Sequence, residues 1–108
     1  MKATVEFKEG VFLELEALRP EMMHGLYVAA LTCPDYGVLT VTSQADGEHQ
    51  DNSLHFRGRA WDIRTRHMTT QDTKDWSLDL RMALGEDWDV VLEVDPPHLH
   101  IEYDPKST

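Results

Sequence analysis

Apolar and polar residues alternate along several short segments of the chain, a pattern that is typical of strands with one buried face. The segments with this pattern are 37–43, 60–65, 89–95 and 98–104. Near the N-terminus Val5 and Phe7 alternate, and after Gly10 the alternation returns at Val11 and two later leucines, Leu13 and Leu15. This first part of the chain predicts an opening strand or hairpin. Pro96 and Pro97 separate the last two predicted strands.

Two longer segments have helical spacing instead. The first begins near Pro20 and ends before Pro34, and its apolar stripe predicts core packing. The members of this stripe are Met22, Met23, Leu26, Tyr27 and Ala30. The second covers 69–85, with threonine and acidic residues at its start and Gly85 as the C-cap. Trp76, Leu80 and Leu84 fall on one face of this second helix.

The order of these elements predicts an α+β domain, in which a small, mainly antiparallel sheet packs against helices. No repeat, low-complexity tract or linker interrupts the sequence, so we predict one domain over residues 1–108. The single cysteine, Cys33, excludes an internal disulfide and is expected to be a small buried residue.

Charge and hydropathy exclude some classes of partner. Twenty acidic residues against ten basic ones give a formal net charge of −10, which argues against nucleic-acid binding. No apolar run approaches the roughly 18 residues that a membrane span needs. The first ten residues lack the apolar region of a signal peptide, so we expect synthesis in the cytoplasm without a leader. We also expect a monomer.

The last predicted strand places chemistry on one face of the sheet. Because side chains alternate, His98, His100 and Glu102 share one face, whereas Leu99 and the other apolar residues share the opposite one. Asp62 likewise emerges from a strand whose other face is apolar. A carboxylate in such a position is costly unless it is paired or bound to a metal. Two imidazoles and a carboxylate are a typical zinc ligand set.

The segment 53–63, SLHFRGRAWDI, resembles the S-x-H-x-x-G-x-A-x-D signature of the D-alanyl-D-alanine metallopeptidases. These are zinc carboxypeptidases and endopeptidases of peptidoglycan, and they include phage endolysins. The segment 98–102, HLHIE, resembles their second signature, H-x-H. The hedgehog signalling domain shares this fold and zinc site, and residues 39–63 are similar to its corresponding stretch. The resemblance covers about residues 37–104.

The resemblance implies that His55, Asp62 and His100 bind zinc, with His98 beside the metal as an active-site group. A second alignment, in D-x-x-H form, would make His98 the third ligand instead. His49 matches a histidine that faces the metal in hedgehog-like members. Ser53 matches the serine of the motif, which positions substrate or orients a ligand.

The resemblance also implies a general base a few residues before the last zinc ligand. Asp95 is preferred by the family's spacing and Glu93 is the alternative, because the two prolines obscure the alignment. Arg57 or Arg59 could bind a substrate carboxylate by a bidentate contact. Some relatives bind calcium through acids in the neighbourhood of residues 46–51, but their full acidic set is not recognisable here, so calcium is not expected.

These features together predict a zinc-dependent peptidase that hydrolyses peptidoglycan stem peptides. It would be a D-Ala-D-Ala carboxypeptidase or an L-Ala-D-Glu-type endopeptidase, and could be a phage lysis enzyme that acts on the cell wall. The alternative is a catalytically silent, hedgehog-like module that binds zinc and a partner but does no chemistry. Neither the bond that is cut nor the source organism follows from the sequence.

Overall fold

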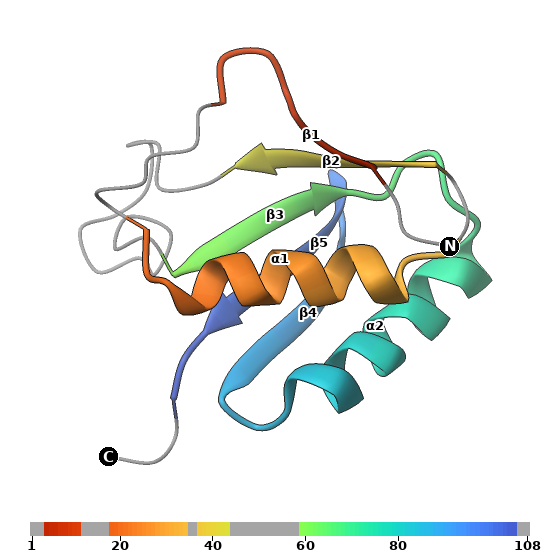
Figure 1. The fold of residues 1–108 in the computed structure, drawn as a ribbon. Helices are drawn as coiled ribbons and strands as arrows, with labels where there is room; N and C mark the ends of the chain where they lie inside the picture. The colour runs from red at the N-terminus through yellow and green to blue at the C-terminus, as the bar shows by residue number, and fades with distance from the viewer. Residues whose placement is uncertain (1–3, 12–17, 35–36, 44–58, 106–108) are drawn as a thin grey trace.

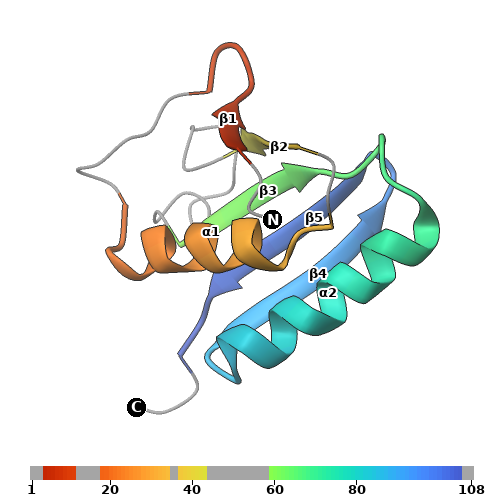
Figure 2. The ribbon, with the colours of Figure 1, turned by 45° about the vertical axis from the view of Figure 1, so that its right-hand side comes forward.

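A five-stranded sheet carries two helices on one of its faces (Figures 1 and 2). The computed structural model describes residues 4–11, 18–34, 37–43 and 59–105. Its elements are β1 (Thr4–Phe7), α1 (Glu21–Thr32), β2 (Val38–Ser43), β3 (Ala60–Arg64), α2 (Thr70–Leu84), β4 (Trp88–Val94) and β5 (Pro97–Tyr103). The predicted helices and strands are therefore confirmed. For the opening segment, the strand at Thr4–Phe7 is confirmed, and residues 12–17 lie outside the described part of the chain.

The strand order is β1-β2-β3-β5-β4. β1 pairs with β2 in parallel, and the other three pairs are antiparallel. The prediction of a mainly antiparallel α+β sheet is therefore confirmed. β3 and β4 each run antiparallel to β5, so they are parallel to one another, and β5 is inserted between them. Each helix thus connects two parallel strands. Both helices lie on the same face, where Trp76 of α2 contacts Ala29 of α1 (Figure 1).

The core lies between the helices and this face of the sheet. Alternate residues of the strands enter it and are completely buried: Leu39 and Val41 from β2, Trp61 and Ile63 from β3, and Leu99 and Ile101 from β5. Two indole N–H groups join the sheet and α2 to α1. Trp61 Nε1 donates to the Met22 carbonyl at 2.9 Å, and Trp76 Nε1 donates to the Ala29 carbonyl at 3.1 Å.

The buried face of α1 is shifted around the helix from the predicted stripe, and it also includes Gly25, Val28 and Ala29. Met22, Leu26 and Ala30 are buried as expected, but Met23 and Tyr27 are 44% and 54% exposed. Successive residues of a helix point about 100° apart, so residues one position after Met22 and Leu26 lie beside the contact with the sheet rather than in it. The prediction that Met23 and Tyr27 belong to the core is therefore wrong.

The second helix has the predicted ends. The Thr69 hydroxyl accepts a hydrogen bond from the Asp72 amide at 3.1 Å, and Gly85 ends the helix with a φ of 87°. The Arg81 guanidinium donates twice to the Val90 carbonyl, which ties the end of α2 to β4. Neither helix of the described part is long and apolar enough to cross a membrane.

Candidate metal centre

The face of the sheet opposite the helices carries the predicted metal ligands of β3 and β5. In the β3–β5 register, Asp62 lies directly opposite His100, and Arg64 lies opposite His98. Directly opposed residues in an antiparallel pair project from the same face, with Cα atoms about 4.5–5.5 Å apart. The register therefore brings Asp62, His98 and His100 together, although Asp62 and His100 are 38 residues apart in the chain. The side chains of all three are at most 20% exposed.

A single carboxylate oxygen connects the three side chains. His100 Nδ1 lies 2.7 Å from Asp62 Oδ1, and His98 Nε2 lies 3.7 Å from the same oxygen. The other ring nitrogen of each histidine also has a partner. His98 Nδ1 donates to the Pro96 carbonyl at 2.7 Å, and His100 Nε2 donates to the Glu102 carboxylate. The Pro96 contact places the proton of a neutral His98 on Nδ1, so Nε2 faces Asp62 with its lone pair.

His100 is held as an imidazolium by its two carboxylate neighbours. Burial acts to lower its pKa, but the hydrogen bonds and negative charges of Asp62 and Glu102 outweigh burial and raise it to about 9. The proton on Nδ1 therefore occupies the position, between Asp62 and His100, that a cation shared by these two side chains would take.

Asp62 Oδ1 lies near each histidine nitrogen at about the separation of two ligands on one metal ion. The three donor atoms do not all lie within 4.8 Å of one another, so Asp62 and one histidine at a time fit a shared ion. Two ligands that each lie about 2.0 Å from a tetrahedral zinc ion are about 3.3 Å apart. The separations of 2.7 and 3.7 Å in the structure lie on either side of that value. Zinc-bound histidines usually donate their second ring N–H to a carboxylate or a backbone carbonyl. Glu102 and the Pro96 carbonyl provide such acceptors, so both histidines are oriented as ligands would be.

Several predicted site residues lie outside the described part of the chain. They are His49, Ser53, His55 and Arg57, together with the loop acids Asp46, Glu48 and Asp51. Arg59 is described and is half-buried, and its carbonyl accepts the Tyr103 amide at 2.8 Å.

The two candidate bases occupy different positions near the hairpin of β4 and β5. Asp95 and Pro96 form the two-residue loop of this hairpin, between the paired residues Val94 and Pro97. Glu93 lies directly opposite His98, on the same face of the sheet as the histidines. Both carboxylates are exposed. The strand register alone thus favours Glu93 as the general base, whereas the spacing of the sequence motif favours Asp95.

A second group of acids was not anticipated from the sequence. Asp89, Glu102 and Asp104 are half-buried, and each offers a carboxylate oxygen within 4.8 Å of the others, so this triad could hold a metal ion. Asp89 on β4 is paired with Glu102 on β5. The alternation of residues 89–95 gives the face of Asp89, but only the pairing of β4 with β5 brings it beside Glu102. Glu102 therefore belongs to the acidic triad and also contacts His100.

The prediction that Cys33 is a small buried residue is confirmed. His24 and His67, which do not belong to the zinc motifs, are exposed. Cys33 is 8% exposed, and burial raises the pKa of its thiol to about 11. In comparisons with known proteins, no family model matches the chain and no curated protein does. The resemblance to the zinc peptidases rests on the two motifs.

Proposed function

We propose that the chain is a zinc-dependent peptidase that cleaves peptidoglycan stem peptides, with a hedgehog-like arrangement of its sheet and helices. The observation that carries the proposal is the Asp62 oxygen that lies 2.7 Å from His100 Nδ1 and 3.7 Å from His98 Nε2. These groups come from two neighbouring strands and are largely shielded from solvent. Charged and titratable groups gathered in this way are typical of functional sites.

In this proposal His55, Asp62 and His100 hold the metal, and His98 is the alternative third ligand. Bound zinc supplies a water whose pKa is lowered to about 7 and polarises the scissile carbonyl. Asp95, or Glu93, accepts the proton of the attacking water and returns it to the leaving amine. His49, or a His98 that carries a proton on both ring nitrogens, would donate to the carbonyl oxygen as negative charge develops. Ser53 and Arg57 position the substrate.

The test is digestion of purified cell walls, with the released fragments identified by mass spectrometry. The zinc-loaded protein should release peptide fragments, chelation should stop the release, and added zinc should restore it. Asp62→Asn should lower zinc affinity at least about tenfold and stop digestion, because the metal loses a charged ligand. Asp79→Asn, on the exposed side of α2, is the matched control and should change neither. Stoichiometric zinc without cleavage would instead support the silent binding module.

The choice of base is tested with one amide substitution at each carboxylate. Asp95→Asn should keep zinc and lose at least about a hundredfold in kcat if Asp95 is the base, whereas Glu93→Gln should then have little effect. The reverse pattern would assign the base to Glu93. Because both side chains are exposed, neither substitution should change the free energy of unfolding by more than about 0.5 kcal/mol.

A further inference from the structure

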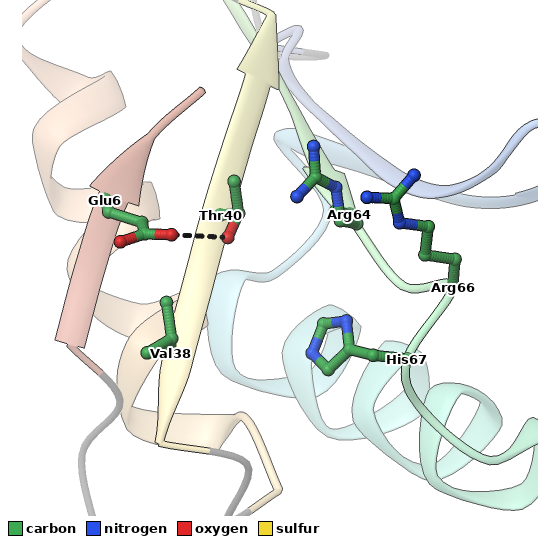
Figure 3. Close-up of a pocket in the computed structure, with 6 residues that line it drawn as sticks. All are labelled: Glu6, Val38, Thr40, Arg64, Arg66 and His67. Atoms are coloured by element: carbon green, nitrogen blue, oxygen red, sulfur yellow. Dashed lines mark hydrogen bonds between the residues drawn. The ribbon is translucent and has the colours of Figure 1, made fainter. Parts of the chain in front are cut away.

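A cationic pocket lies on the same face of the sheet as the candidate metal centre. Its volume is about 290 Å³, and it is lined by Glu6, Val38, Thr40, Arg64, Arg66 and His67. Figure 3 shows these side chains converging from β1, β2, β3 and the segment that follows β3. Arg64 is half-buried and Arg66 is exposed.

The pocket is adjacent to the metal centre because of the strand register. Arg64 lies two residues after Asp62 on β3, so their side chains share a face. Arg64 also lies directly opposite His98 on β5. The pocket therefore begins one cross-strand pair beyond Asp62 and His100.

The charge of the pocket is opposite to that of the molecule. The whole chain carries a formal charge of −10, yet the pocket holds two guanidinium groups and one carboxylate, that of Glu6. The Glu6 carboxylate accepts a hydrogen bond from the Thr40 hydroxyl at 3.3 Å. Among the described residues, neither Arg64 nor Arg66 makes an ion pair. Two guanidinium groups beside a pocket are a typical binding site for a carboxylate.

The separation suits the end of a peptide. Consecutive residues of a peptide are about 3.8 Å apart, so a carboxylate one residue beyond a cleaved bond lies within about 5 Å of the scissile carbonyl. Arg64 lies two residues from Asp62 on β3, about 6.6–6.8 Å along the strand, so its long side chain can reach a carboxylate held beside the metal centre.

We propose that Arg64 and Arg66 form a subsite for the C-terminal carboxylate of the substrate. This inference rests on the proposed function and makes it more specific. A carboxylate bound there requires the cleaved bond to be the last of the peptide, so the chain is a carboxypeptidase rather than an endopeptidase. Arg64 supplies the contact nearest the metal, Arg66 supplies a second, and Glu6 opposes them by repelling the anion.

Binding can be measured without cleavage. The probe is a stem peptide that ends in D-alanyl-D-alanine, with its last amide reduced to an amine, as the free acid and as the C-terminal amide. The zinc-loaded protein should bind the acid at least tenfold more tightly than the amide by calorimetry. Arg64→Gln should remove about ten- to hundredfold of the affinity for the acid and leave the amide unchanged. The affinity of Arg64→Lys for the acid should lie between those of the parent protein and Arg64→Gln, because lysine keeps the charge but not the bidentate geometry.

Two further variants serve as a control and as an independent test. Arg19→Gln removes an arginine that lies over the Tyr103 ring, on the helix side of the sheet, and should leave binding of both peptides unchanged. Glu6→Gln should strengthen binding of the acid about two- to fivefold, so the proposal is testable even if the Arg64 variants fold poorly. Equal binding of acid and amide, or no detectable binding of either, would overturn the subsite.

The subsite and the proposed function fail in different ways. If the acid binds selectively through Arg64 but neither natural peptide is cleaved, the subsite stands and the peptidase proposal fails. If acid and amide are cleaved equally and Arg64→Gln changes neither KM, the peptidase stands and the subsite fails. Release of internal fragments from a peptide amide, with kinetics unaffected by Arg64→Gln, would identify an endopeptidase.

Discussion

His100 is the residue on which the chemistry of the site most depends. Its two ring nitrogens contact carboxylates on either side, Asp62 across the strand pair and Glu102 two residues along β5. In the absence of a metal this arrangement favours the protonated ring. A metal ion between Asp62 and His100 must therefore displace a proton, which couples pH, folding and metal binding at one residue.

The metal-free protein should lose stability as the pH rises from about 6.5 to about 9. The pKa of His100 is raised to about 9 in the folded state, against about 6.5 in the unfolded chain, so the folded state holds the proton more tightly. The stabilisation is complete below pH 6.5 and is lost as the pH passes 9. Its size is at most about 3 kcal/mol. Urea unfolding at several pH values in the presence of chelator measures it.

The matched variant for this prediction is His100→Gln, which keeps a polar side chain but cannot be protonated. Its free energy of unfolding should vary less with pH between 6.5 and 9 than that of the parent protein. Equal slopes for the two proteins over this range would show that His100 is not the group responsible.

Zinc binding should release close to one proton from His100 at pH 7.5. The ring is protonated at that pH because its pKa is raised to about 9, and a metal ligand must be deprotonated. Calorimetric titration in two buffers with different ionisation enthalpies gives the number of protons released. The release should fall by about one in His100→Gln, and an unchanged value would exclude His100 as a ligand.

At the scale of elements, the strand pattern was the most informative part of the sequence. The alternation of residues 98–104 gave the correct faces for His98 and His100, with Leu99 and Ile101 in the core. The helical spacing of the apolar residues in α2 and its threonine N-cap were also predictable, because both are local properties. Tyr27 was placed wrongly, since the direction in which a helix faces the sheet depends on which strands it covers.

The pairings between elements were not predictable from local pattern. Only the strand order places Arg64 beside His98, and Asp89 beside Glu102. The cationic pocket and the acidic triad both follow from that order, so neither could be predicted from the alternation within one strand. The sequence could not decide between the two candidate bases for the same reason, because their positions depend on where the β4–β5 hairpin turns.

The contact between α1 and β4 depends on a glycine. A Cβ atom on Gly25 would lie 2.4 Å from Cη2 of the Trp88 indole, which itself packs against Tyr103 at a centroid distance of 5.2 Å. Gly25→Ala should therefore destabilise the protein by about 1–3 kcal/mol in urea unfolding, despite the better helix propensity of alanine. In a Trp88→Phe background, where the ring is smaller, the same substitution should cost less. Equal costs in both backgrounds would contradict the steric explanation.

At the scale of the molecule, the two helices occupy one face of the sheet and leave the other for chemistry. β3 and β5 lie next to one another within the sheet (Figure 2). Both strands contribute side chains to its two faces. Trp61 and Leu99 hold the core side, while Asp62 and His100 project to the opposite side. The candidate metal centre thus rests on two strands fixed by the core, an arrangement that would keep its side chains rigid.

Metal should stabilise the whole fold. Zinc that binds the folded state alone adds about 2.7 kcal/mol at a free concentration one hundred times its Kd. For a domain of this size the melting temperature should rise by about 10 °C or more. Differential scanning calorimetry with and without zinc measures the shift. Asp62→Asn should abolish most of it, whereas Asp104→Asn, which alters only the acidic triad, should not.

The most direct test of the account is anomalous diffraction at the zinc edge from crystals of the zinc-loaded protein. The account predicts one strong peak about 2.0–2.2 Å from both the Asp62 carboxylate and the His100 imidazole, with His55 as the third protein ligand. A peak confined to Asp89, Glu102 and Asp104, or no peak near Asp62 in fully loaded crystals, would contradict it.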